Sequence, residues 1–232
     1  MKVSVIIPTM NEEASIGEVI HSIKDAFAAA NVSIFAKEPL DYEILVVDTN
    51  SKDRTREIAR EKGAIVIDEP RRGYGRAYKT GFEKATGEII ATLDGDSTYP
   101  AERIPELVHL LLRKNIDFIT CDRLSTLKPG VMSFKHRVGN KILTFTANLL
   151  FGVKIKDSQS GMWIFRKEIL KKLRLESDGM PFSEEIKIEA FRKCRCIEVP
   201  IEYRVRKGEV KLSSWKDGTR NIKYLFRMKF RK

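Results

Sequence analysis

Short apolar runs alternate with helical patterns through the first half of the chain. After the first apolar run, at 2–8, apolar residues recur at helical spacing from Ile16 to Phe27. Further apolar runs lie at 42–47, 64–67, 89–94 and 117–121, and helical patterns separate them. Strands that alternate with helices in this way predict an α/β fold, a doubly wound and mostly parallel sheet.

The run at 89–94 ends in two carboxylates, Asp94 and Asp96, with Gly95 between them. In open α/β sheets, ligands bind just beyond the carboxyl ends of the strands. Residues i and i+2 of an extended segment point the same way, so both carboxylates face one ligand. Such oxygen ligands suit Mg²⁺ or Mn²⁺ shared with substrate phosphates, and Gly95 lets a phosphate approach the backbone. A polar turn at the strand end is the alternative interpretation.

Composition narrows the choice of partners and compartment. The net charge of +11 over 232 residues favours anionic partners, which are phosphates, nucleic acid or an anionic membrane face. Three cysteines without a signal peptide indicate a reducing compartment, the cytoplasm. No apolar stretch reaches the ~18 residues of a membrane-spanning helix. Without a linker or a repeat, the whole chain, 1–232, is predicted to be one domain.

The second half of the chain contains two basic, apolar segments, at 134–151 and 215–232. Segments that mix Lys and Arg with aromatic and aliphatic residues can lie in a membrane interface and be drawn to anionic lipid. An ordinary helix packed on the sheet is the alternative for the first segment. We therefore treat peripheral attachment to the cytoplasmic membrane face as a hypothesis.

Several segments together, in this order, resemble the glycosyltransferase family 2 enzymes of GT-A fold. The chain is most similar to the branch that makes polyprenyl-phosphate sugars, such as dolichyl-phosphate mannose synthases. The matching segments are 3–12, 45–48 with 51–55, 94–96, 157–163, 198–201, 206–208 and 211–212. The resemblance covers nearly the whole chain.

The resemblance implies an inverting, metal-assisted transfer of one sugar from a UDP- or GDP-sugar to polyprenyl (dolichyl) phosphate. It assigns about 1–125 to the nucleotide sugar and about 126–232 to the acceptor. Asp94 and Asp96 become the catalytic metal ligands for Mg²⁺ or Mn²⁺. The residues implied in binding the nucleotide sugar are Pro8, Thr9, Asn11, Glu12, Asp48, Thr49, Gly75, Asp94, Gly95, Asp96, Arg206 and Lys211.

Two departures limit what the resemblance implies. The family commonly has a second aspartate after the one at position 48, and it usually meets the base. Here Thr49 stands in its place and carries no charge to pair with two base donors, so the identity of the base stays open. The Gln-X-X-Arg-Trp motif of processive polysaccharide synthases is absent from the sequence.

The acceptor side needs cations beside an apolar surface. The residues that we expect at the acceptor phosphate are Arg123, Arg137, Asn140 and Lys141. An acceptor hydroxyl would need a general base, for which Asp157 or Glu185 could serve. An acceptor phosphate needs none, because its second pKa of ~6 leaves it anionic at neutral pH. Asp157 is equally interpretable as a turn residue.

Three other functions remain open from the sequence. One is a family 2 transferase with a soluble sugar or glycan acceptor, and another is a non-catalytic module that binds nucleotide sugars. Nucleic-acid binding is disfavoured, because the basic residues are spread along the chain without an aromatic RNA-recognition motif.

Overall fold

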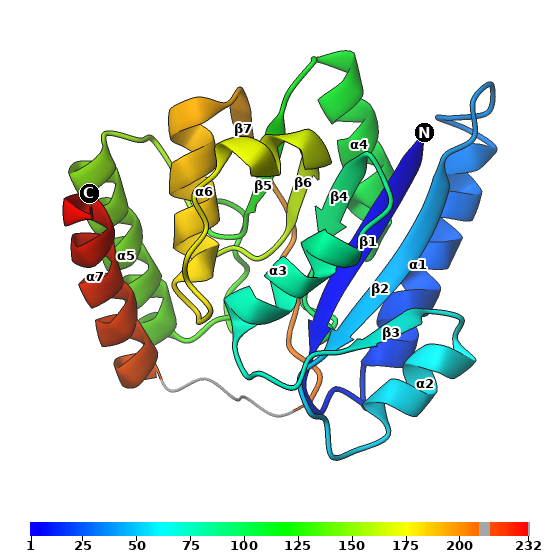
Figure 1. Cartoon of the computed structure of the whole chain (residues 1–232), viewed down its shortest axis with the longest axis horizontal. Coiled ribbons are helices and arrows are strands. Elements are labelled where there is room, and N and C mark those ends of the chain that lie inside the picture. The colour runs from blue at the N-terminus through cyan, green and yellow to red at the C-terminus, as the bar shows by residue number, and fades with distance from the viewer. Residues whose placement is uncertain (209–213, 232) are drawn as a thin grey trace.

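A central sheet carries the predicted strands in a computed structural model that describes residues 1–208 and 214–231, with the side chains of 214–217 excepted. Within these residues seven strands form one sheet in the order β3-β2-β1-β4-β6-β5-β7 (Figure 1). Their bounds are β1 Lys2–Thr9, β2 Asp41–Asp48, β3 Ile65–Asp68, β4 Ile89–Thr92, β5 Phe118–Asp122, β6 Trp163–Arg166 and β7 Cys196–Pro200. The predicted α/β, mostly parallel fold is confirmed.

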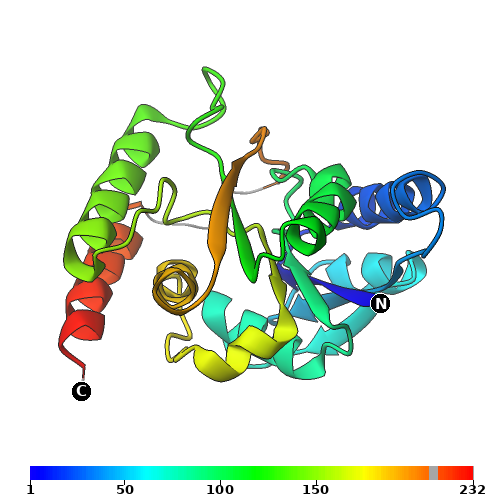
Figure 2. The same cartoon turned by 90° about the horizontal axis from the view of Figure 1, so that it is seen from above.

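Helices cover both faces of the sheet, as Figure 2 shows from above. Apolar side chains of α1 (Ile16–Asn31) and α4 (Ile104–Arg113) pack in one buried cluster with the strands. Those of α3 (Tyr74–Lys84) and α6 (Phe182–Lys193) pack in a second cluster on the other face. Burial on both faces explains why the strands are almost continuously apolar. The remaining helices between strands are α2 Thr55–Glu61 and the short 3₁₀ turns η1 Ala101–Arg103 and η2 Lys167–Lys172.

Strand β6 runs opposite to its neighbours. It pairs antiparallel with β4 on one side and with β5 on the other, so it separates two strands that both point the same way. Its amino-terminal end therefore lies at the edge where β4 and β5 have their carboxyl ends. This insertion brings the segment just before β6, residues 157–161, to the ligand-binding edge of the sheet.

Helices α5 (Phe134–Phe151) and α7 (Ser214–Phe230) lie side by side outside α6 (Figures 1 and 2). They meet α6 in a small third cluster that contains Ala147, Ile188 and Leu225. Helix α5 occupies the whole of the basic, apolar segment at 134–151, for which a packed helix was one of two interpretations. Among the described residues, no helix combines the length and the apolar character that crossing a bilayer requires.

Two local details differ from what the sequence pattern suggested. Helix α1 begins at Ile16 after Ser15, so Asn11 is not its N-cap. Asn11 instead takes a left-handed backbone, with φ of 56°, in the turn that follows β1. The last strand is shorter than the predicted 197–204, because residues 201–208 leave the sheet and cross its carboxyl edge. There the Lys207 amide donates to the Asp96 carbonyl over 3.1 Å.

Candidate active site

The carboxyl ends of the parallel strands gather the predicted donor-site residues at one edge of the sheet. Thr9 ends β1, Asp48 ends β2, and the register pairs these two residues directly. Asp94 follows β4, and Arg123 follows β5. Residues far apart in sequence therefore meet because their strands are parallel and in register.

Asp94 and Asp96 lie in the loop after β4. The Asp96 carboxylate is almost fully buried and accepts hydrogen bonds from the Thr98 amide (3.1 Å) and hydroxyl (2.6 Å). Arg206 bridges two acidic residues: its guanidinium contacts Asp96 Oδ2 at 2.9 Å and Glu12 Oε1 at 2.9 Å. Asp94 Oδ1 accepts a hydrogen bond from the Tyr74 hydroxyl at 3.2 Å.

The acidic pair fits a hard divalent cation, although it does not complete a site by itself. The described residues contain no group of three or more His, Cys, Asp or Glu side chains that could hold a metal ion. Asp94 and Asp96 would supply two oxygen ligands, and a nucleotide diphosphate and water would supply the others. Burial, followed by the Asp96 charge, raises the pKa of Asp94 to about 7, which shows how closely the two carboxylates are crowded.

The turn after β1 and the loop after β2 are tied together by their polar side chains. The Thr9 hydroxyl donates to Asp48 Oδ2 over 3.1 Å, and the Asn11 side-chain oxygen accepts from the Lys52 amide over 2.7 Å. The Thr49 hydroxyl donates to the Thr9 carbonyl over 3.0 Å, so this proton is already used within the protein. The Glu12 amide donates to the Thr55 hydroxyl over 2.8 Å.

The other predicted donor residues occupy different surroundings. Pro8 lies within β1. A Cβ at Gly95 would face the Thr9 methyl at 3.2 Å, and one at Gly75 would press on the Phe182 Cβ at 2.6 Å. The space beside both glycines is therefore filled by protein, and close packing explains the glycine at 75. Lys211 lies outside the described residues.

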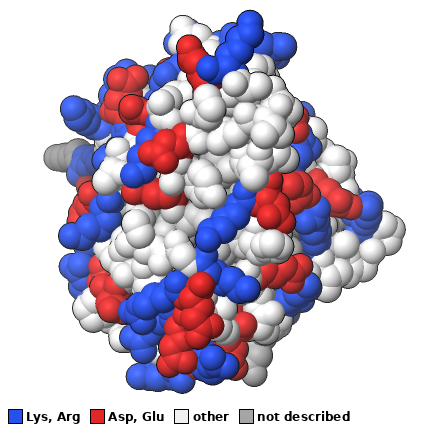
Figure 3. Space-filling view, turned by 90° about the vertical axis from the view of Figure 1, so that its right-hand side faces the viewer, with Lys and Arg blue, Asp and Glu red and all other residues white. Residues whose placement is uncertain are grey.

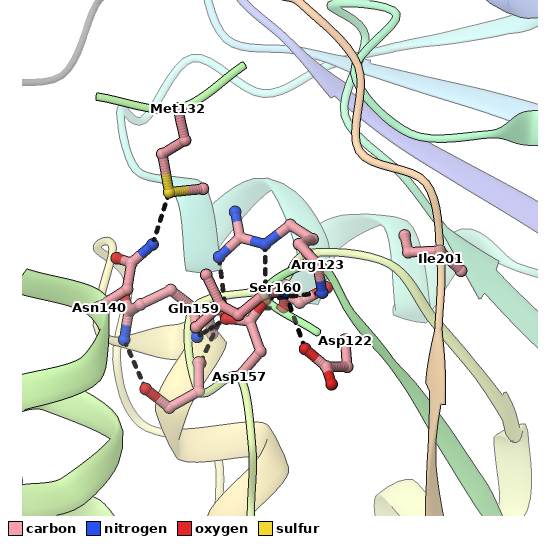
Figure 4. A network of polar contacts seen from close by, with 12 residues as sticks. Asp122, Arg123, Met132, Asn140, Asp157, Gln159, Ser160 and Ile201 are labelled. Atoms are coloured by element: carbon pink, nitrogen blue, oxygen red, sulfur yellow. Dashed lines mark hydrogen bonds and ion pairs between the residues drawn. The ribbon is translucent and has the colours of Figure 1, made fainter. Parts of the chain in front are cut away.

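Arg123 is buried and points onto Asp157, which is fully buried (Figure 4). Its Nε and Nη2 donate to the two carboxylate oxygens over 2.7 and 2.9 Å, and its backbone amide donates over 3.1 Å. Burial alone would raise the pKa of Asp157, but the Arg123 charge and hydrogen bonds hold it below its usual value. Asp157 Oδ1 also accepts from the Gln159 amide over 3.1 Å, as expected of a turn residue, while both carboxylate oxygens hold Arg123.

The 157–161 loop connects this ion pair to the acidic pair. At its far end, the Gly161 amide donates to the Tyr99 hydroxyl over 2.7 Å, and the Thr92 hydroxyl donates to the Gly161 carbonyl over 2.8 Å. A Cβ at Gly161 would collide with the Tyr74 hydroxyl and would lie 3.3 Å from Asp94 Oδ1. Only glycine lets the loop pass this close to Asp94.

The predicted acceptor residues of α5 lie in different positions. Arg137 and Lys141 are exposed, whereas Asn140 is partly buried and donates to the Met132 sulfur over 3.5 Å. Asn140 and Gln159 line an apolar cleft of about 480 Å³ between α5 and α7, to which α7 contributes Asn221 and Ile222. Figure 4 shows Asn140 and Gln159 in one polar cluster with Asp157 and Arg123.

Helix α6 contributes buried charged residues whose role sequence reasoning missed. Lys187 and Glu184 are fully buried beneath the 157–161 loop, and Gln159 donates to Glu184. Glu185 had been considered as a base, but it accepts from Arg231 over 2.9 Å and from Tyr224 over 2.5 Å, which ties α6 to α7. The available signal was six charged residues in a helix of twelve that must contact the sheet.

Known structures share the fold. Glucosyl-3-phosphoglycerate synthase from Mycobacterium tuberculosis, crystallised with Mn²⁺, UDP and glucosyl-3-phosphoglycerate, superposes with a TM-score of 0.74 at 22% identity, over 98% of this chain and 79% of that one. The same enzyme crystallised with Mg²⁺ and UDP also gives a TM-score of 0.74. These likenesses support the GT-A fold of the protein.

Curated relatives are more similar in sequence. The low-salt glycan biosynthesis hexosyltransferase Agl6 of Haloferax volcanii is 37% identical over 96% of this chain and 52% of its own length. The dolichyl-phosphate hexose transferase of Haloferax volcanii is 34% identical over 93% and 88%. The dolichol-phosphate mannosyltransferase of Pyrococcus furiosus is 30% identical over 91% and 59%. The chain thus spans about half of Agl6 and most of the hexose transferase.

The family model described as glycosyl transferase family 2 matches residues 4–174. That range contains β1 to β6, the acidic pair and the 157–161 loop. With the fold, the edge site and relatives above 30% identity in agreement, the chain belongs to glycosyl transferase family 2.

Proposed function

We propose that the protein transfers one sugar, with inversion, from a nucleotide-diphosphate sugar to a polyprenyl phosphate. The observation that carries this proposal is the apolar cleft between α5 and α7, because its polar end joins the cluster that contains Arg123. A lipid phosphate combines a compact dianion with an apolar tail, and this site combines an arginine with an apolar cleft. Residues of about 1–125 bind the donor and those of about 126–232 bind the acceptor.

The relatives support the same chemistry. Two of them are named for hexose or mannose transfer involving dolichyl phosphate, and the solved neighbours hold UDP with Mn²⁺ or Mg²⁺. A nucleotide sugar is therefore the donor that we propose, with UDP or GDP as its nucleotide. A polyprenyl phosphate is the acceptor.

On the donor side, the residues must receive a diphosphate as it leaves. A divalent cation held by Asp94 and Asp96 would neutralise the charge that develops on the diphosphate. Arg206 already contacts Asp96 and Glu12, so its guanidinium is within reach of a diphosphate bound at these acids. Asp48 and the turn at Thr9 hold the loops that enclose the nucleoside.

On the acceptor side, Arg123 orients the lipid phosphate. A phosphate oxygen attacks the anomeric carbon from the face opposite to the diphosphate, so one carbon–oxygen bond forms as the other breaks and the configuration inverts. The electron pair of the broken bond leaves with the nucleoside diphosphate. No base is needed, since the phosphate is already anionic. The state of Asp157 agrees with this, because its carboxylate is engaged by Arg123.

An exposed apolar face of α5, part of which also lines the cleft between α5 and α7, supports peripheral attachment to the cytoplasmic membrane face. Five apolar residues at helical spacing form an exposed stripe: Phe134, Val138, Ile142, Phe145 and Leu149. Phe145 and Leu149 are 67% and 71% exposed, and Arg137 and Lys141 lie beside the stripe. An exposed apolar helix face rimmed by cations suits the interface of an anionic bilayer.

The net charge of +11 does not form a basic face on the side of the molecule that Figure 3 shows. On the side that carries α1 and α2, Lys and Arg alternate with Asp and Glu (Figure 3). A nucleic-acid backbone needs a continuous basic stripe, and this side of the molecule has none.

The test uses radiolabelled UDP- and GDP-sugars with dolichyl phosphate in detergent. We expect label to pass into the organic phase only when lipid phosphate and Mg²⁺ or Mn²⁺ are present. Label that stays in the aqueous phase on a soluble sugar or glycan would overturn the lipid acceptor. If the protein bound the nucleotide sugar but transferred no sugar, a non-catalytic module that binds nucleotide sugars would be the better interpretation.

Membrane attachment is tested by flotation with anionic liposomes. The double change Phe145→Ser and Leu149→Ser should lower the floated fraction severalfold. Val32→Ser is the matched control, because Val32 is 80% exposed but follows α1 rather than lying on α5. Absence of wild-type flotation even at low salt would reject the attachment.

A further inference from the structure

Lys187 is the most unusual buried group outside the residues used so far. It lies in the middle of α6 with 0% of its surface exposed. Its ammonium donates to two backbone carbonyls, those of Asp157 (3.0 Å) and Ser160 (2.7 Å). Within the described part of the chain it forms no ion pair within 4.0 Å. Burial of a lysine is costly, and here its hydrogen bonds all go to one loop.

The loop that Lys187 holds spans both halves of the site. At one end the Asp157 side chain grips Arg123, and at the other Gly161 passes beside Asp94. Lys187 donates to carbonyls near both ends, so a single atom sets the separation between them. Displacement of the loop would move the proposed acceptor arginine relative to the proposed metal ligands.

The other hydrogen bonds of the 157–161 loop show which of its carbonyls depends on Lys187. The Ser160 carbonyl also accepts from Trp163 Nε1 (2.8 Å) and from the Ser183 hydroxyl (3.1 Å). Glu198 on β7 accepts from the Asp157 amide over 3.2 Å. For the Asp157 carbonyl, Lys187 is the donor that the described residues provide. The Asp157 end of the loop, which binds Arg123, therefore depends on Lys187 more than the Gly161 end, which lies near Asp94.

We propose that Lys187 is a positioning residue for acceptor transfer, holding the 157–161 loop so that Arg123 faces the phosphate of the acceptor. This inference rests on the proposed function. The direct contact with substrate belongs to Arg123, and Lys187 acts through the Asp157 backbone. Burial lowers the pKa of Lys187 to about 7, with Asp157 and Glu198 opposing that change and Arg123 adding to it. Its charge therefore makes a poor stabiliser of the fold.

A structural role and a positioning role predict different results for Lys187→Met. Methionine fills a similar volume without a charge, but it leaves the buried Asp157 carbonyl without its donor, which costs some stability. We expect a modestly lower unfolding midpoint, together with a fall of about 10- to 100-fold in kcat/KM for dolichyl phosphate. The dissociation constant of the nucleotide should stay within about twofold, because Asp48 and Arg206 do not contact the loop.

Hydrogen exchange followed by mass spectrometry gives a readout that does not depend on activity. Peptides that cover 157–161 should exchange faster in Lys187→Met, whereas those covering β1 and β2 should not change. Lys187→Arg, which retains several donors, should keep more acceptor transfer than Lys187→Met. Lys193→Met is the matched control, because Lys193 is an exposed residue of the same helix.

The outcomes separate this inference from the proposed function. Normal acceptor kinetics and normal loop exchange in Lys187→Met would overturn the positioning role. So would a parallel loss of nucleotide binding and stability, or failure of both Lys187 variants to fold, since each indicates a general structural role. If the wild-type protein made no lipid-linked sugar, the proposed function and the acceptor role of Lys187 would both fall.

Discussion

Two aspartates at the same edge of the sheet have opposite electrostatic environments. Asp94 lies beside another carboxylate: burial and the charge of Asp96 raise its pKa to about 7, although Arg123 and Arg206 act in the other direction. Asp157 is more deeply buried, yet the charge and hydrogen bonds of Arg123 outweigh that burial and lower its pKa. One carboxylate is crowded by like charge, and the other is neutralised by a partner.

The contrast indicates what each region is built to do. Crowded carboxylates at a strand end cost stability unless a cation joins them, so we assign the Asp94 region to ligand binding. A buried carboxylate gripped by two guanidinium nitrogens is complete without a ligand, so we assign the Asp157 region to geometry. Substitution of Asp94 should therefore affect activity alone, and substitution of Asp157 should affect both stability and activity.

The largest effect is expected from Asp94→Ala or Asp96→Ala. Either change removes a proposed metal ligand, and transfer should fall by at least about 100-fold. The circular dichroism spectrum should stay near that of the wild type for both variants. The unfolding midpoint should stay near the wild-type value for Asp94→Ala, whereas Asp96→Ala also loses contacts with Thr98 and Arg206 and should unfold somewhat earlier. Asp41→Asn, at the opposite edge of the sheet, is the control. Full wild-type turnover in excess chelator would contradict the metal role.

Asp157→Asn is the corresponding change in the second region. It leaves the buried Arg123 charge without its partner, and breaking a buried ion pair costs about 3 kcal/mol. Urea denaturation should show this loss as a lower midpoint, together with slower transfer to lipid phosphate. Glu102→Gln breaks a half-exposed pair with Arg204 and should change the free energy of unfolding much less. Equal stability of the two variants would remove the contrast between Asp94 and Asp157.

The change Arg137→Lys tests whether Arg137 belongs to the acceptor site. Arg137 is exposed, so the change should not alter the unfolding midpoint. The loss of a planar fork should raise the acceptor KM by about 10-fold while nucleotide binding is unchanged. Arg60→Lys, an exposed arginine of α2, serves as the control. An unchanged KM would exclude Arg137 from the acceptor site.

The smallest effect is a pH-dependent change in stability from Glu184→Gln. Burial raises the pKa of Glu184 to about 8, so between its unfolded value of 4.5 and about 8 the folded state binds more protons than the unfolded state. Its contribution to stability therefore falls as the pH rises through that window. Glutamine resembles the protonated acid, so the variant does not lose this stability as the pH rises.

Thermal unfolding of both proteins from pH 5 to pH 8.5 tests the titration of Glu184. The two midpoints should be similar at pH 5, and the variant should be higher by about 3 °C or more at pH 8.5. Lys187 lies on the same helix and interacts with the Glu184 charge, so the difference between the two proteins reports the loss of that charge together with its effect on Lys187. A difference that does not change with pH would show that Glu184 keeps an ordinary pKa.

Local patterns were sufficient for the elements and for one part of the candidate site. An apolar run reports burial, and helical spacing reports an amphipathic helix, so the alternating strands and the helix at Phe134–Phe151 were predictable. Asp94 and Asp96 were predictable as a pair because they are two residues apart at the end of one strand.

The sequence by itself determined which segments become strands and helices, and that carboxylates follow β4. The tertiary structure decided that β6 enters antiparallel between β4 and β5, which brings the 157–161 loop to Asp94 and Asp157 to Arg123. It also buried Lys187 beneath that loop. The physical reason is that periodicity depends on neighbouring residues, whereas strand pairing and ion pairing depend on residues that are distant in the chain and meet only in the fold.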